Sequence, residues 1–117
     1  MDKDMVPMCD ALNALSGVRT FFCCSGHGRG NEGEFYISLG CSSMKSLKSI
    51  TRAFSRKIRD NAVSARYTVD VDYDFWPLRK NEIEVRVSNP RVDHLNARRR
   101  KKEFDEVIRL LKDENYQ

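Results

Sequence analysis

The chain has 117 residues, of which 40% are hydrophobic and 32% charged, and its formal net charge is +4 at pH 7. This length and balance predict a single globular domain over residues 1–117 and argue against global disorder. Because no apolar run reaches the length of a membrane span and the N-terminus lacks a signal-peptide pattern, we expect a cytoplasmic protein with no membrane partner.

The first part of the chain predicts a helix followed by a hairpin. Apolar residues at three- and four-residue spacing indicate a helix over 5–16, with Gly17 behind it in left-handed geometry. Alternation predicts antiparallel strands over 18–24 and 34–40 around a glycine-rich turn. On the first strand, alternation puts on one face Val18, Thr20, Phe22 and Cys24, and on the other face Arg19, Phe21 and Cys23.

A second helix follows, capped by Ser42 or Ser43 and running to about residue 61. Helical spacing predicts that its apolar face consists of Met44, Leu47, Thr51, Phe54 and Ile58. The opposite face carries a basic stripe of Lys45, Lys48, Arg52, Arg56 and Arg59. Two interpretations stay open, a solvated outer face and an anion-binding stripe for nucleic acid or an acidic partner.

The second half predicts strands over 64–73 and 82–88, joined by a loop that carries the only Trp. Asn89-Pro90 predicts the start of a last helix that runs to about residue 113. Arg100 falls on the apolar stripe of that helix, so it must snorkel, pair with an acid or face a partner.

The element order α-β-β-α-β-β-α predicts an α+β fold, a four-stranded antiparallel sheet with helices on one face. The other face is expected to carry mixed charge, with Arg19, Tyr36, Arg66, Asp70, Asp72, Glu84 and Arg86. Such a face suits water or a polar subunit interface. The four cysteines, Cys9, Cys23, Cys24 and Cys41, are expected as reduced thiols in this compartment.

The glycine-rich turn is the leading candidate site. Its simplest interpretation is a plain loop. In the alternative, the anion cradle, its glycines let backbone N–H groups approach a phosphate while His27 and Arg29 add donors. A metal site on Cys24 and His27 lacks a second clustered ligand pair, and a thiolate–imidazole pair lacks an orienting acid. We therefore expect no metal, no cofactor and no catalytic residue, and both the loop and the cradle stay open.

Two other stretches offer chemistry for a nucleotide. Phe75 and Trp76 either cover the sheet edge or stack on a base, with Arg79 nearby for a phosphate. The run from Arg98 to Lys102 is either a solvated charge run or a source of arginines for phosphates.

The segment Leu12-Asn13-Ala14-Leu15-Ser16-Gly17-Val18-Arg19-Thr20, followed by Cys24-Ser25-Gly26-His27-Gly28, resembles the phage anti-Thoeris sponge proteins. The match covers about the first quarter of the chain. It implies a small α+β anti-defence protein in the host cytoplasm that sequesters cyclic ADP-ribose isomers without cleaving them. It also implies a homo-oligomer larger than a dimer, with a hexamer as one expected size. Some members hold cyclic oligonucleotides, the signals of CBASS defence.

A second resemblance is to the wybutosine-synthesis methyltransferases, which have a helix followed by a Ser-Cys-Ser-Gly turn. Cys23-Cys24 and His27 depart from that pattern. Nucleic-acid binding by the basic stripe and a tRNA-modifying enzyme are thus the alternatives to a non-enzymatic sponge. The residues expected to bind the ligand are Ser25, Gly26, His27, Gly28, Arg29, Phe75, Trp76, Arg79, Arg98, Arg99 and Arg100.

Overall fold

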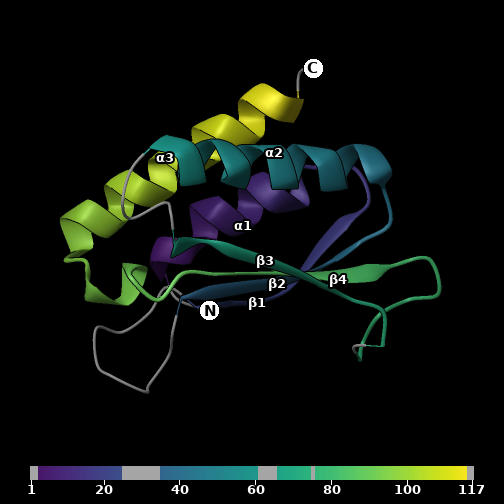
Figure 1. The fold of residues 1–117 in the computed structure, drawn as a ribbon. Coiled ribbons are helices and arrows are strands. Elements are labelled where there is room, and N and C mark those ends of the chain that lie inside the picture. The colour runs from purple at the N-terminus through teal and green to yellow at the C-terminus, as the bar shows by residue number, and fades with distance from the viewer. Residues whose placement is uncertain (1–2, 25–34, 61–65, 75, 116–117) are drawn as a thin grey trace.

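The computed structural model describes residues 3–24, 35–60, 66–74 and 76–115. Its helices and strands are α1 (Val6–Asn13), β1 (Val18–Cys24), β2 (Tyr36–Cys41), α2 (Met44–Asp60), β3 (Thr68–Asp72), β4 (Ile83–Ser88) and α3 (Ala97–Asn115). Short 3₁₀ turns precede α1 at Lys3–Met5 and α3 at Val92–His94. The predicted α+β class and element order are confirmed (Figure 1).

The four strands form one antiparallel sheet in the order β1-β2-β4-β3. All three α-helices lie on the same side of this sheet (Figure 1). Between the two layers lies an aromatic cluster, in which the Phe35 ring stacks on Phe104 at 5.4 Å and meets the edge of Tyr67 at 6.2 Å. Phe54 of α2 joins this cluster at 5.0 Å from Tyr67, and the remaining large core side chains are aliphatic residues and methionines from both layers.

The opposite face of the sheet is the polar face that the sequence predicts. Arg86 lies over the ring of Tyr36 at 4.7 Å, and Ser38 donates a hydrogen bond to the buried carboxylate of Glu84. Of the residues predicted here, Arg66 lies before β3 begins.

Strict alternation is wrong for the second half of β1. Thr20 pairs with Leu39 but Phe22 pairs with Ser38, so Phe21 is an extra residue, a β-bulge. Beyond the bulge the faces exchange: Phe22 points to the polar face and is 49% exposed, while Cys23 packs against the core. No residue in this strand marks the bulge, so the alternation of apolar and polar residues could not predict it.

The buried face of α2 is rotated relative to the prediction. Ser43 caps the helix as expected, since its Oγ accepts the N–H of Ser46 at 3.2 Å. However, Met44 is 66% exposed and Ile58 39%, whereas Lys57 is buried. The apolar spacing alone could not show that α3 supplies carboxylates to a buried lysine.

The last helix begins later than predicted. The Oδ1 atom of Asn89 accepts the N–H of Arg91 at 3.0 Å, but this turn leads into the 3₁₀ segment and not into α3. Asn96 is the cap of α3, because its Oδ1 accepts the N–H of Arg99 at 2.9 Å. Asn89-Pro90 therefore precedes the 3₁₀ turn, and the prediction that it starts the last helix is wrong.

The expectation of reduced cysteines is wrong for one pair. A disulfide joins Cys9 of α1 to Cys23 of β1, with Cα atoms 7.3 Å apart. The pairing depends on two tertiary features that the sequence does not display, namely α1 packing on β1 and the bulge that turns Cys23 toward it. Cys41 is a free, buried thiol, and its burial raises the pKa of that thiol.

Candidate functional site

The predicted ligand-binding residues fall into three groups. Ser25, Gly26, His27, Gly28 and Arg29 lie outside the described residues, as does Phe75, so the anion cradle stays a prediction. Trp76 and Arg79 lie on the loop between β3 and β4, and Arg98, Arg99 and Arg100 lie in the first turns of α3.

The loop and the start of α3 lie at opposite ends of the sheet (Figure 1). The loop joins Asp72 to Ile83, which pairs with Cys41, whereas the chain leaves the sheet toward α3 at Ser88, which pairs with Tyr36. A strand of five or six residues spans roughly 17–20 Å. One chain therefore does not bring Trp76 and Arg79 into the same pocket as Arg98 and Arg99.

The loop between β3 and β4 is pinned by Glu82. The Arg19 guanidinium donates to both carboxylate oxygens, Nε to Oε2 at 2.8 Å and Nη2 to Oε1 at 2.6 Å. The N–H of Arg79 donates to Oε1 at 2.8 Å, and Arg19 also reaches the carbonyl of Pro77 at 3.4 Å. Trp76, which precedes these bonded residues in the chain, is 85% exposed. This geometry suits an aromatic platform, as the sequence suggests.

We expect acid to weaken the hydrogen bonds that the Glu82 carboxylate accepts from Arg19 and Arg79. The hydrogen bonds from Arg19 lower the pKa of Glu82 from 4.5 to about 2, although burial alone would raise it. A carboxyl whose pKa is lower in the folded state stabilises the fold above its unfolded pKa, and this stability is lost as the pH falls from about 4.5 toward 2. In Glu82→Gln, the free energy of unfolding should therefore depend less on pH over this window.

Urea denaturation at neutral and acid pH measures that dependence. Asp113→Asn removes an exposed carboxylate on α3 and serves as the control that should keep the wild-type slope. Equal acid dependence in wild type and E82Q would show that Glu82 does not carry the effect.

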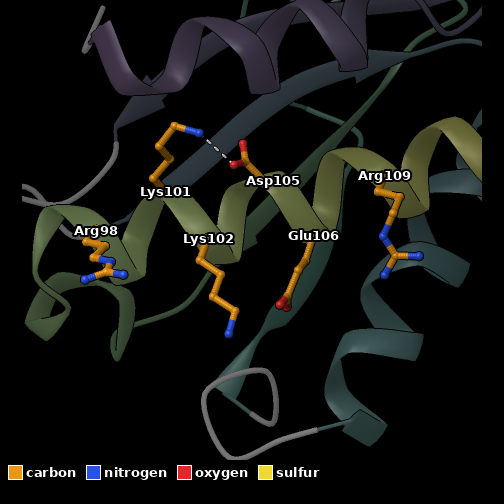
Figure 2. A pocket seen from close by; sticks show the side chains of 6 residues that line it. All are labelled: Arg98, Lys101, Lys102, Asp105, Glu106 and Arg109. Atoms are coloured by element: carbon orange, nitrogen blue, oxygen red, sulfur yellow. Dashed lines mark hydrogen bonds and ion pairs between the residues drawn. The ribbon is translucent and has the colours of Figure 1, made fainter.

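A shallow, open groove that is lined mainly by cations runs along about the first three turns of α3 (Figure 2). Its volume is about 360 Å³, and it is lined by Arg98, Lys101, Lys102, Asp105, Glu106 and Arg109. A second hollow of about 470 Å³ adjoins it, lined by Asn96, Arg98, Arg99 and Lys102. The two hollows share Arg98 and Lys102, and cations outnumber carboxylates in both. We refer to them together as the α3 groove.

The cations of the α3 groove differ in how they are paired. Lys101 is bound to Asp105 at 2.8 Å. Arg98, Arg99 and Lys102 form no ion pair with any residue that the structure describes. Cations in the first turn of a helix also oppose its dipole, which favours anions there. A bound anion would pair with these cations and would offset their unfavourable interaction with the helix dipole.

Arg100 is not part of this groove. Its side chain is 17% exposed and its Nε lies 3.3 Å from Oδ2 of Asp4. Of the three alternatives that the sequence left open for Arg100, the structure shows the pairing with an acid, and that acid belongs to the same chain. Its assignment as a ligand-binding residue is not supported by this placement, because helical rotation turns it toward the N-terminal segment while Arg98 and Arg99 are exposed.

A buried ionic cluster lies beneath the groove. The Nζ of Lys57 contacts Glu106 and lies 3.1 Å from Oε1 of Glu103, and the hydroxyl of Tyr67 donates to Oε2 of Glu103 at 2.6 Å. Burial alone lowers the pKa of Lys57, but the hydrogen bonds to Glu106 and Glu103 outweigh it and raise that pKa. Burial, followed by the charge of Glu103, holds the pKa of Tyr67 well above its usual value. Lys57 is thus a buried ammonium that fixes Glu106 at the groove wall.

Asp105, Glu106 and Arg109 line the groove and were not predicted from the sequence, whereas Lys101 and Lys102 were predicted only as part of the basic run. A signal was present, because Arg98, Lys102, Glu106 and Arg109 recur at three- and four-residue spacing and must share one helix face. In the part of the chain that the structure describes, no group of three His, Cys, Asp or Glu side chains could hold a metal ion, and no helix is long and apolar enough to cross a membrane.

Comparison with protein-family models, with curated proteins and with solved structures finds no match to this chain. What the protein does is therefore inferred from the chemistry of its described residues and from the resemblance in its N-terminal quarter.

Proposed function

We propose that this protein binds a phosphate-bearing signalling nucleotide in the α3 groove and holds it without turning it over. The observation that carries the proposal is the cluster of Arg98, Arg99 and Lys102, which are exposed, share two adjoining hollows and have no ionic partner among the described residues. Guanidinium groups bind phosphates with paired hydrogen bonds, and the lysine adds a point charge.

The resemblance to anti-Thoeris sponges supplies the first ligands to test, cyclic ADP-ribose isomers and then cyclic oligonucleotides. It also supports retention of the intact ligand, a location in the host cytoplasm and a homo-oligomer, with a hexamer as one size. The loop between β3 and β4 and the start of α3 lie at opposite ends of the sheet. This arrangement agrees with an oligomer in which the loop of one copy approaches the groove of another.

Thermal shift with mass recovery tests sequestration. A cyclic ADP-ribose isomer should raise the melting temperature, because a ligand that binds only the folded state increases the free energy of unfolding by RT ln(1 + [L]/Kd). Denaturation should then release the ligand with unchanged mass. Recovery of an altered ligand would instead show an enzyme. A melting temperature that no signalling nucleotide raises, even at high concentration, would overturn the proposal.

Charge reversal tests the groove itself. Arg98→Glu with Lys102→Glu should weaken ligand binding by about 100-fold or more, because each lost charged hydrogen bond is worth roughly 1.5–3 kcal/mol. Lys48→Glu with Arg52→Glu makes the same charge change on the exposed face of α2, and it should bind as the wild type does. Calorimetric titration measures both, and equal losses in the two variants would point to overall charge and not to the α3 groove.

Nucleic-acid binding is a second candidate function, favoured by the exposed cations of α2. Lys45, Lys48, Arg52 and Arg59 are exposed and form no ion pair with a described residue. In this case K48E/R52E would lose oligonucleotide binding that depends steeply on salt, while R98E/K102E would lose less of it.

A further inference from the structure

Glu106 is an exception in the α3 groove, a carboxylate at the wall of a site rich in cations. Its side chain is 34% exposed, and it points from α3 in the same direction as Lys102 (Figure 2). A bare phosphate would gain from a neutral or basic residue at this position, since like charges repel. Glu106 adds a hydrogen-bond acceptor to a site rich in cations, so a ligand that brings hydrogen-bond donors as well as phosphate suits the groove better than a bare phosphate.

The two carboxylate oxygens of Glu106 have different surroundings. Oε2 is held by the Nζ of Lys57, whose side chain is only 3% exposed, so the carboxylate is fixed from beneath the groove. Oε1 forms no hydrogen bond with any residue that the structure describes. Asp105, the other carboxylate of the groove, is engaged instead by Lys101 at 2.8 Å.

We propose that Glu106 is the specificity-determining acceptor of the α3 groove, which receives hydrogen bonds from the ribose hydroxyls of a phosphate-bearing ligand. This inference rests on the proposed function and adds the class of ligand: a ribose phosphate with free hydroxyls, in preference to a bare polyphosphate. Lys57 is a positioning residue, because it reaches Glu106 from below and is too buried to line the groove. Because Lys57 already fixes the Glu106 carboxylate, this acceptor is pre-organised for hydroxyl donors, and analogues that lack those hydroxyls should bind less tightly.

Calorimetric titration of the full-length protein with three probes tests this assignment: ADP, 2′,3′-dideoxy-ADP and inorganic pyrophosphate. We expect the wild type to bind ADP about tenfold or more tightly than dideoxy-ADP, the factor for one hydrogen bond to a charged group. This comparison uses no variant, so it holds whatever a substitution does to the fold.

Glu106→Gln then localises the effect. Its one acceptor oxygen stays with Lys57 and an amide donor faces the groove, so the preference for ADP should disappear while pyrophosphate binds at least as well as before. Asp10→Asn removes an exposed carboxylate on α1, outside the groove, and as the matched control it should keep the preference for ADP.

The outcomes separate the two proposals. If none of the three probes binds, the assignment of Glu106 is wrong, and the thermal shift with cyclic ADP-ribose isomers decides the proposed function separately. If all three bind but ADP and dideoxy-ADP bind equally, the proposed function stands and the assignment of Glu106 is wrong. If E106Q keeps the full preference for ADP, the hydroxyls are recognised elsewhere, and the assignment of Glu106 is again wrong.

Discussion

Replacing Lys57 with Met is expected to lower the free energy of unfolding by about 3–5 kcal/mol, because removing one member of a buried ion pair leaves an uncompensated charge. Glu103 has a side chain only 7% exposed, and it would lose the Nζ that lies 3.1 Å away. The hydrogen bond from Tyr67 would remain, but a neutral hydroxyl does not balance a carboxylate. Urea denaturation followed by circular dichroism measures the loss.

Two comparisons isolate the cause. Lys48→Met removes an exposed lysine from the same helix and should change stability by no more than about 0.5 kcal/mol. Adding Glu103→Gln to Lys57→Met should recover part of the loss, because a buried amide is less costly than a buried carboxylate. A loss below about 1 kcal/mol in K57M would mean that the cluster is not desolvated in solution.

Phe35→Ala should cost about 3–5 kcal/mol, through lost burial and the cavity that remains. The Phe35 ring is fully buried between the sheet and the helices, where it meets Tyr67 and Phe104. Phe22→Ala removes the same atoms from the polar face of the sheet, where Phe22 is 49% exposed, and should cost much less.

This pair also tests the β-bulge. Without the extra residue at Phe21, alternation would keep Phe22 on the same face as Val18, which packs in the core. Equal denaturation losses in F22A and F35A would therefore contradict the register of β1. A small loss in F22A beside a large one in F35A is the result that the bulge requires.

The fold was largely predictable because alternating apolar residues in the strands report burial directly. In β4, Val85 and Val87 are buried in the core and Arg86 is exposed, as alternation predicts, whereas Glu84 on the polar face is buried and accepts a hydrogen bond from Ser38. The errors arose where tertiary contacts override local spacing. Lys57 is the clearest case, because no local pattern marks a lysine that will be buried against carboxylates 46 to 49 residues away.

The candidate site was predictable in part. The run of basic residues pointed to Arg98 and Arg99, which line the groove as described. Arg100 was grouped with them because the three arginines are consecutive in the sequence. Each step along a helix rotates the side chain by about 100° around the helix axis, so consecutive residues face different directions. Glu106 was missed because its role depends on Lys57 from another helix.

The exposed tryptophan has a practical consequence for spectroscopy. Trp76 is the only Trp of the chain, and it is 85% exposed on a loop at the far end of the sheet from the α3 groove. Its fluorescence therefore reports the surroundings of that loop, and neither the core nor a ligand in the groove of the same chain lies close to the indole. A signal that changes on ligand addition would come from a second copy of the chain brought against the loop.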